Sequence, residues 1–122
     1  MIEIVISSDA HALVAAEQAK DLAKNIGFSE VNQTKIAIAT SELAKNIVIH
    51  AEGRGRVVIK PIIEHHKTGI EVIAEDSGPG IADMEKALQG DGLSGVKRLM
   101  DEFEIETKVG EGTKITVKKW KI

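Results

Sequence analysis

The chain has 122 residues and a formal net charge of −3 at pH 7, with 43% hydrophobic and 29% charged residues. This length allows one domain, which we expect to span residues 1–122, and the composition is that of an ordered globular protein. Aromatic residues make up only 2% of the chain. Few stacking side chains and a net negative charge argue against a nucleic-acid partner.

The chain contains no cysteine, which excludes a disulfide framework and a thiolate metal site. No apolar run approaches the length needed to span a membrane, and the N-terminal residues lack the pattern of a secretory signal. We therefore expect a cytoplasmic protein that has no membrane contact.

The N-terminal quarter predicts a strand followed by a helix. Isoleucine at every second position predicts a strand over residues 1–7. Ser8 and Asp9 offer capping oxygens for a helix that continues with helical spacing of apolar residues to about Ile26. Gly27 then provides a C-terminal stop.

A second helix and a β-hairpin follow. Ser29 resembles an N-cap, and apolar periodicity predicts a helix from there to about His50. Residues 56–64 and 69–75 are β-branched runs, which predict an antiparallel hairpin joined by residues 65–68.

The C-terminal half predicts loops, short helices and a last hairpin. The Gly/Pro content makes residues 76–80 a loop. Short helices are expected over 83–88 and 94–101, and strands over 103–109 and 113–119.

This order groups the strands as hairpins, which predicts an α+β protein: a two-layer sandwich with a mixed, mostly antiparallel sheet and the helices on one face. Lysines gather at the C-terminus, and we interpret them as the solvated protection of an edge strand. These residues are Lys114, Lys118, Lys119 and Lys121.

Glu42 and Asn46 are a candidate polar pair in the middle of the second helix. Residues four apart share a helix face, so the two side chains project together, and His50 lies one turn further on. An amide oxygen can ligate Mg²⁺, and a carboxylate can accept a hydroxyl proton. The alternative is an ordinary exposed Glu/Asn pair.

Two glycine-containing segments are candidates for ligand contact. In the first, residues 76–80, Asp76 at a strand end can accept from an exocyclic amine, and glycines allow a close approach of backbone N–H groups. The second, Gly90–Gly95, opens a helix and is a candidate phosphate cradle. The alternative for residues 76–80 is a plain strand-to-helix turn, and Gly110 and Gly112, which lie beyond the second segment, are expected in a hairpin in any case.

In this order the motifs resemble the N box and glycine boxes of the GHKL (Bergerat-fold) superfamily, and most of all its anti-sigma and stressosome switch kinases. The resemblance covers nearly the whole chain, through residues 40–51, 76–83, 95–103 and 110–113. It implies that ATP and Mg²⁺ are bound, that Glu42 is the general base, and that Asn46 is the Mg²⁺ ligand. The other nucleotide-binding residues that it implies are Asp76, Gly78, Gly80, Gly92, Gly95 and Thr113.

The resemblance also implies a serine/threonine kinase that phosphorylates a STAS-domain partner in a bacterial stress-response switch, with a downstream phosphatase as a second partner. An exposed apolar surface separate from the pocket would then bind the STAS-domain protein. The alternative is a non-catalytic switch that sequesters the STAS scaffold and activates the phosphatase by contact. A histidine kinase is disfavoured because no dimerisation helix precedes the domain, and a gyrase- or Hsp90-like ATPase because it would need further domains.

The chain departs from the family in one segment. Relatives carry a longer glycine-rich lid with repeated Gly-Leu-Gly units, whereas this sequence has only Gly90–Gly95 there. Either the lid is truncated, or a segment is missing from the sequence. A shortened lid would weaken the retention of the phosphates.

Overall fold

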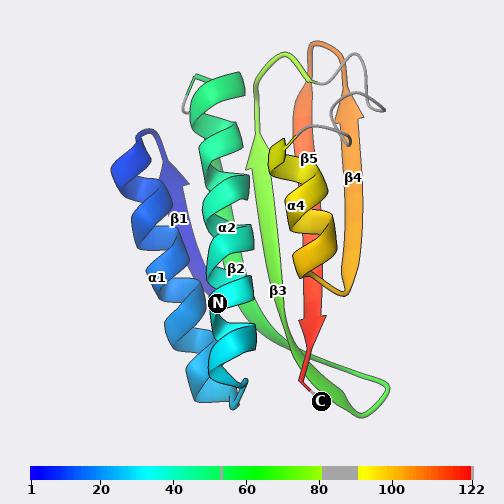
Figure 1. Ribbon diagram of the computed structural model, residues 1–122. Helices are drawn as coiled ribbons and strands as arrows, with labels where there is room; N and C mark the ends of the chain where they lie inside the picture. The colour runs from blue at the N-terminus through cyan, green and yellow to red at the C-terminus, as the bar shows by residue number, and fades with distance from the viewer. Residues whose placement is uncertain (53, 81–90, 122) are drawn as a thin grey trace.

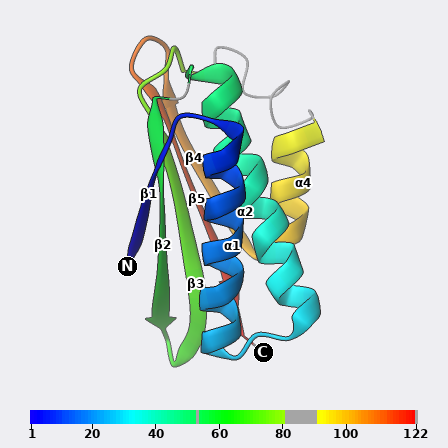
Figure 2. The same cartoon turned by 90° about the vertical axis from the view of Figure 1, so that its left-hand side faces the viewer.

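The computed structural model describes residues 1–52, 54–80 and 91–121. Its helices are α1 (Asp9–Ile26), α2 (Glu30–His50) and α4 (Asp91–Leu99), and its strands are β1 (Ile2–Ile6), β2 (Gly55–Glu64), β3 (Lys67–Asp76), β4 (Glu102–Lys108) and β5 (Gly112–Trp120). The strands form one sheet in the order β1-β2-β3-β5-β4. The helices cover one face of this sheet and leave the other bare (Figures 1 and 2).

The α+β prediction is thereby confirmed, and the three described helices lie on one face as predicted. The sheet is not mixed, however, because every pairing between the described strands is antiparallel. The helix predicted over 83–88 lies outside the described residues. In the part of the chain that is described, no helix combines the length and apolar content needed to cross a membrane.

The ends of α1 and α2 follow the predicted signals with one exception. The side chain of Ser29 caps α2 by accepting from the backbone N–H of Asn32 at 3.2 Å, and Gly27 ends α1 with a left-handed φ of 105°. Ser8 occupies the N-cap of α1 but makes no side-chain capping bond. Instead, Nδ1 of His11 accepts from the N–H of Ser7 at 3.0 Å.

The β2–β3 hairpin is tighter than predicted. His65 and His66 alone form its turn, and both have positive φ angles, 50° and 67°. Two positive φ angles in succession match the twist of the flanking strands and permit a two-residue connection. Lys67 and Thr68, predicted as loop, therefore belong to β3.

β5 is not the predicted edge strand, because it lies between β3 and β4. Lys119 on β5 is only 7% exposed. Its Nζ donates to the carbonyl of Leu99 at 2.8 Å and pairs with Asp101 at 3.6 Å. Lys119 therefore holds the C-terminal end of α4 against β5, a structural role that a solvated edge lysine does not have.

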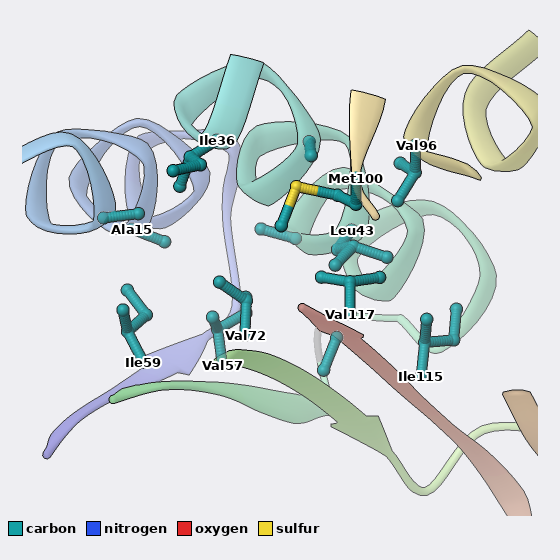
Figure 3. Packing of buried hydrophobic residues seen from close by; sticks show 14 of the residues in the cluster. Ala15, Ile36, Leu43, Val57, Ile59, Val72, Val96, Met100, Ile115 and Val117 are labelled. Atoms are coloured by element: carbon teal, nitrogen blue, oxygen red, sulfur yellow. The ribbon is translucent and has the colours of Figure 1, made fainter. Parts of the chain in front are cut away.

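The core lies between the helices and the sheet (Figure 3). α1 contributes only alanines to its fully buried face, so this helix can lie close to the strands. α2 and α4 contribute larger side chains that meet the inward residues of β2, β3 and β5. Those labelled in the figure include Ile36, Leu43, Val57, Val72, Val96, Met100 and Val117.

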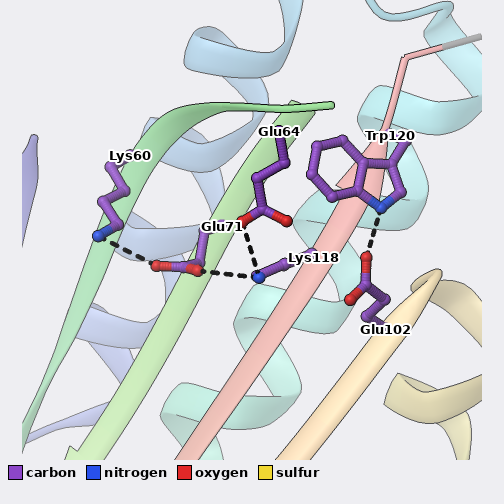
Figure 4. A network of polar contacts seen from close by, with 6 residues as sticks. All are labelled: Lys60, Glu64, Glu71, Glu102, Lys118 and Trp120. Carbon is purple, nitrogen blue, oxygen red and sulfur yellow. Dashed lines mark hydrogen bonds and ion pairs between the residues drawn. The ribbon is translucent and has the colours of Figure 1, made fainter. Parts of the chain in front are cut away.

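The bare face of the sheet carries a cross-strand network of charges (Figure 4). Glu71 on β3 is 8% exposed and lies between Lys60 at 3.2 Å and Lys118 at 3.9 Å. Lys118 also donates to Glu64 at 2.9 Å, and this hydrogen bond raises the pKa of Lys118 above its ordinary value. A nearly buried carboxylate is thus neutralised from both sides.

Candidate functional site

Glu42 and Asn46 lie on α2 at the margin of its buried face. Leu43 and Ile47, which follow them in sequence by one residue each, are fully buried in the core. Both polar side chains are half-buried, so each is only partly exposed to solvent. The structure therefore brings this predicted pair together on one helix face.

The first turn of α4 packs directly against this pair. A Cβ atom added at Gly92 would lie 3.5 Å from Oε2 of Glu42 and 3.7 Å from Oδ1 of Asn46. α4 begins three residues earlier than predicted, so residues 91–93, expected to precede the helix, belong to it. Gly95 differs from Gly92, because no atom lies within 4 Å of a Cβ added there. Gly90 lies outside the described residues.

The loop after β3 contacts the C-terminal end of α2. Asp76 is the last residue of β3, and its Oδ1 accepts from the backbone N–H of Gly78 at 2.9 Å. A Cβ added at Gly78 would lie 2.8 Å from Cβ of Ala51, the C-cap of α2. Glycine at position 78 thus lets the loop approach α2 just beyond Asn46.

A polar row crosses the sheet at the same level. Asp76 pairs with Thr113 on β5, and Thr113 pairs with Thr107 on β4. Each lies two positions from a core-packed residue of its own strand, which are Ala74, Ile115 and Ile105, so all three face the helices. The hydroxyls of Thr107 and Thr113 lie 2.9 Å apart. Thr107 was missed from the sequence, although its place opposite Thr113 across a short turn is a usable signal.

The β4–β5 turn closes this end of the sheet over the same loop. Gly80 and Gly112 have φ angles of 77° and 107°. A Cβ at Gly112 would overlap the carbonyl oxygen of Asp76, and one at Gly80 would meet the carbonyl of Lys108. The N–H of Gly110 also donates to the carbonyl of Pro79 at 2.8 Å. These glycines thus fix the backbone that carries Asp76 and Thr113.

A hollow of about 300 Å³ lies at this end of the sheet. It borders Asp76, Thr107 and Thr113, but Glu75 and Lys114, which point to the bare face, line it as well. The hollow therefore opens along the end of the sheet and is not confined to the helix-covered side.

The residues present fit a magnesium nucleotide. Asn46 and Glu42 supply hard oxygen atoms of the kind that Mg²⁺ prefers, and Gly92 leaves space beside them. In the described segments no donor to the second carboxylate oxygen of Asp76 is found, so this oxygen suits an exocyclic amine. The same segments contain no group of three or more His, Cys, Asp or Glu that is placed to hold a metal ion.

Comparison with known proteins agrees with this geometry. The family model of the histidine kinase-like ATPase domain matches residues 6–119. The serine/threonine-protein kinase RsbT of Bacillus subtilis is 45% identical over 118 residues, covering 88% of each chain. An anti-sigma F factor of Thermoanaerobacter sp. is 37% identical over 99 residues, covering 70% of this chain and 68% of its own.

A solved structure gives the same result for the fold. The RsbU and RsbW domains of a Mycobacterium tuberculosis protein superpose with a TM-score of 0.72 over 97% of this chain, at 18% sequence identity. This chain spans 31% of that structure's chain. The chain therefore belongs to the histidine kinase-like ATPase domain family, and within it to the group of serine/threonine-protein kinases and anti-sigma factors.

The alignment with the Bacillus kinase also bears on the lid. The alignment has 118 positions, but it includes only 88% of the 122 residues of this chain, which is fewer than 118. Some positions are therefore occupied in the relative and missing from this chain. A shorter lid in this chain agrees with that difference.

Proposed function

We propose that this chain is a cytoplasmic, ATP-dependent serine/threonine-protein kinase that phosphorylates a STAS-domain protein in a bacterial stress-response switch. The observation that carries the proposal is the Glu42–Asn46 pair facing the side-chain-free start of α4 at Gly92. The relationship to a serine/threonine-protein kinase at 45% identity supports it.

Glu42 acts as the general base in this proposal. It accepts the proton of the substrate hydroxyl while that oxygen bonds to the γ-phosphorus and the bond to the β-phosphate oxygen breaks, which gives a phosphoester and ADP. Asn46 would hold Mg²⁺ through its amide oxygen, and a bound ion would supply charge neutralisation at the phosphates. Half-burial of both side chains keeps their interactions partly shielded from water.

The nucleotide is held along α2. Asp76 accepts from the adenine amino group with its second oxygen, while Gly78 and Gly80 shape the pocket around the base. Thr113 would lie beside the base, and Gly92 and Gly95 would let the N-terminal part of α4 approach the phosphates.

A non-catalytic partner switch is the second candidate. The relationship to anti-sigma F factors favours it. The residues that this chain lacks within the region aligned with the Bacillus kinase favour it too, because a shortened lid holds phosphates less tightly. In this case the chain sequesters a STAS-domain scaffold and activates a downstream phosphatase by contact. Glu42 then has no chemical role.

A transfer assay tests the proposal. The chain is incubated with Mg²⁺, γ-³²P-ATP and each purified STAS-domain protein of Bacillus subtilis, the organism of the 45% identical kinase. We expect label on serine or threonine of at least one of these proteins. Stable complexes without any label would replace the kinase by the switch.

A further inference from the structure

α2 carries a stripe of exposed apolar side chains on its solvent face. Val31, Ile38 and Ile49 are 65%, 47% and 68% exposed. They are spaced by seven and eleven residues, which places them on one side of a helix. The opposite side of α2 is buried against the sheet, so the stripe is not part of the core.

Glu42 borders this stripe. It is four residues after Ile38 and seven before Ile49, and both spacings return to the same helix face. The rise of a helix places Ile38 about 6 Å and Ile49 about 10 Å from Glu42 along the axis. The other exposed large apolar residues of the described chain lie outside α2, such as Ile63 on β2 and Val5 on β1.

We propose that Val31, Ile38 and Ile49 of α2 form the docking surface for the protein substrate, which presents an apolar patch with acidic groups beside its phosphorylated serine or threonine. The proposal rests on the proposed kinase function. A general base must come within hydrogen-bond distance of the hydroxyl, so the substrate must cover the surface around Glu42. A standard interface buries about 800 Å² per partner, a patch of about 16 Å radius that includes Ile38 and Ile49.

The charges beside the stripe determine the chemistry of the partner. Between Val31 and Ile49 the charged residues are Lys35, Glu42 and Lys45. With Glu42 engaged in catalysis, the remaining surface is apolar and basic. Such a surface steers an acidic partner and excludes a basic one. Raising the ionic strength is therefore expected to raise the KM for the protein substrate.

The test is the double variant Ile38→Gln, Ile49→Gln, with Ile63→Gln as the matched control. All three side chains are exposed, and glutamine is well tolerated in a helix such as α2, so the fold should survive in the double variant. Transfer of phosphate from γ-³²P-ATP is measured with the STAS-domain protein of Bacillus subtilis that accepts label in the transfer assay. We expect the KM for the protein to rise at least ~10-fold in the double variant, because exposed anchors carry much of the binding energy. The KM for Mg·ATP should stay unchanged, and Ile63→Gln should match the wild type.

The outcomes are distinguishable. An unchanged KM for the protein in the double variant overturns the docking surface and leaves the kinase in place. A matching rise in the Ile63→Gln control overturns it too, since the loss would not be specific to α2. If the wild-type chain labels no STAS-domain protein, the kinase function fails, and the docking surface falls with it.

Discussion

Gly92 at the start of α4 faces Glu42 on α2, and a single methyl group at Gly92 would reach van der Waals contact with the Glu42 carboxylate at 3.5 Å. This relationship links the position of α4 to the chemistry proposed for α2. The space beside Gly92 accepts a methyl group without displacing any atom. A substitution there can therefore affect ligand binding without disturbing the fold.

Gly92→Ala should bind nucleotide less tightly without losing stability. The added methyl group lies beside both Glu42 and Asn46, where a phosphate oxygen or Mg²⁺ would lie. Alanine is also the better helix former by up to ~1 kcal/mol, so the free energy of unfolding should stay equal or rise. Isothermal titration should show a dissociation constant for Mg·ATP raised ~10-fold, or ~1.4 kcal/mol. Wild-type affinity in the variant would place the phosphates elsewhere.

Gly112→Ala should destabilise the protein much more than Gly110→Ala. Both glycines have left-handed φ angles, 107° and 83°, so both substitutions carry a backbone cost of ~1 kcal/mol. Only at Gly112 does the new Cβ overlap another atom, the carbonyl oxygen of Asp76, while Gly110 has open space. Urea denaturation should give a loss of ~1 kcal/mol for Gly110→Ala and ~3 kcal/mol or more for Gly112→Ala. Equal losses would show that the turn can move away from Asp76.

Lys119→Met should destabilise the fold by ~1–3 kcal/mol, because it removes a charged hydrogen bond inside the protein. The lost contacts are those with the carbonyl of Leu99 and with Asp101, which hold the end of α4. Lys114→Met is the matched control on the same strand. Lys114 is exposed, so its replacement should change the free energy of unfolding by no more than ~0.5 kcal/mol. Similar values for the two variants in thermal denaturation would contradict the role of Lys119.

Local signals in the sequence predicted the elements, and long-range pairing explains what they missed. The cap at Ser29 and the stop at Gly27 depend on nearby backbone, so they were predictable. The place of β5 inside the sheet depends on contacts with β3, more than thirty residues away, and no local pattern encodes it. Lys119 was misinterpreted for this reason.

The candidate site also combines features that local sequence predicts with features that depend on long-range packing. Glu42 and Asn46 share a face because helical periodicity places them there, and this was predictable from spacing alone. That Gly92 faces them, and that Thr107 joins Asp76 and Thr113, depends on how α4 and the β4–β5 hairpin dock. The roles of these residues toward a nucleotide remain predictions.

The Glu42→Gln and Asn46→Ala variants separate catalysis from binding. Glu42→Gln keeps the shape and a hydrogen-bonding group but loses the proton acceptor, so nucleotide binding should persist while phosphate transfer falls ~10²–10⁴-fold, the usual contribution of a general base. Asn46→Ala removes the amide oxygen that would ligate Mg²⁺, so Mg²⁺-dependent nucleotide binding should weaken and transfer should fall as a consequence. Both side chains are half-buried at the helix margin, so neither change should cost much stability. Titration with Mg·ATP and with ATP in EDTA, followed by single-turnover transfer, measures each step on each variant. Wild-type transfer by Glu42→Gln would remove Glu42 from the chemistry and favour the partner switch that acts by binding alone.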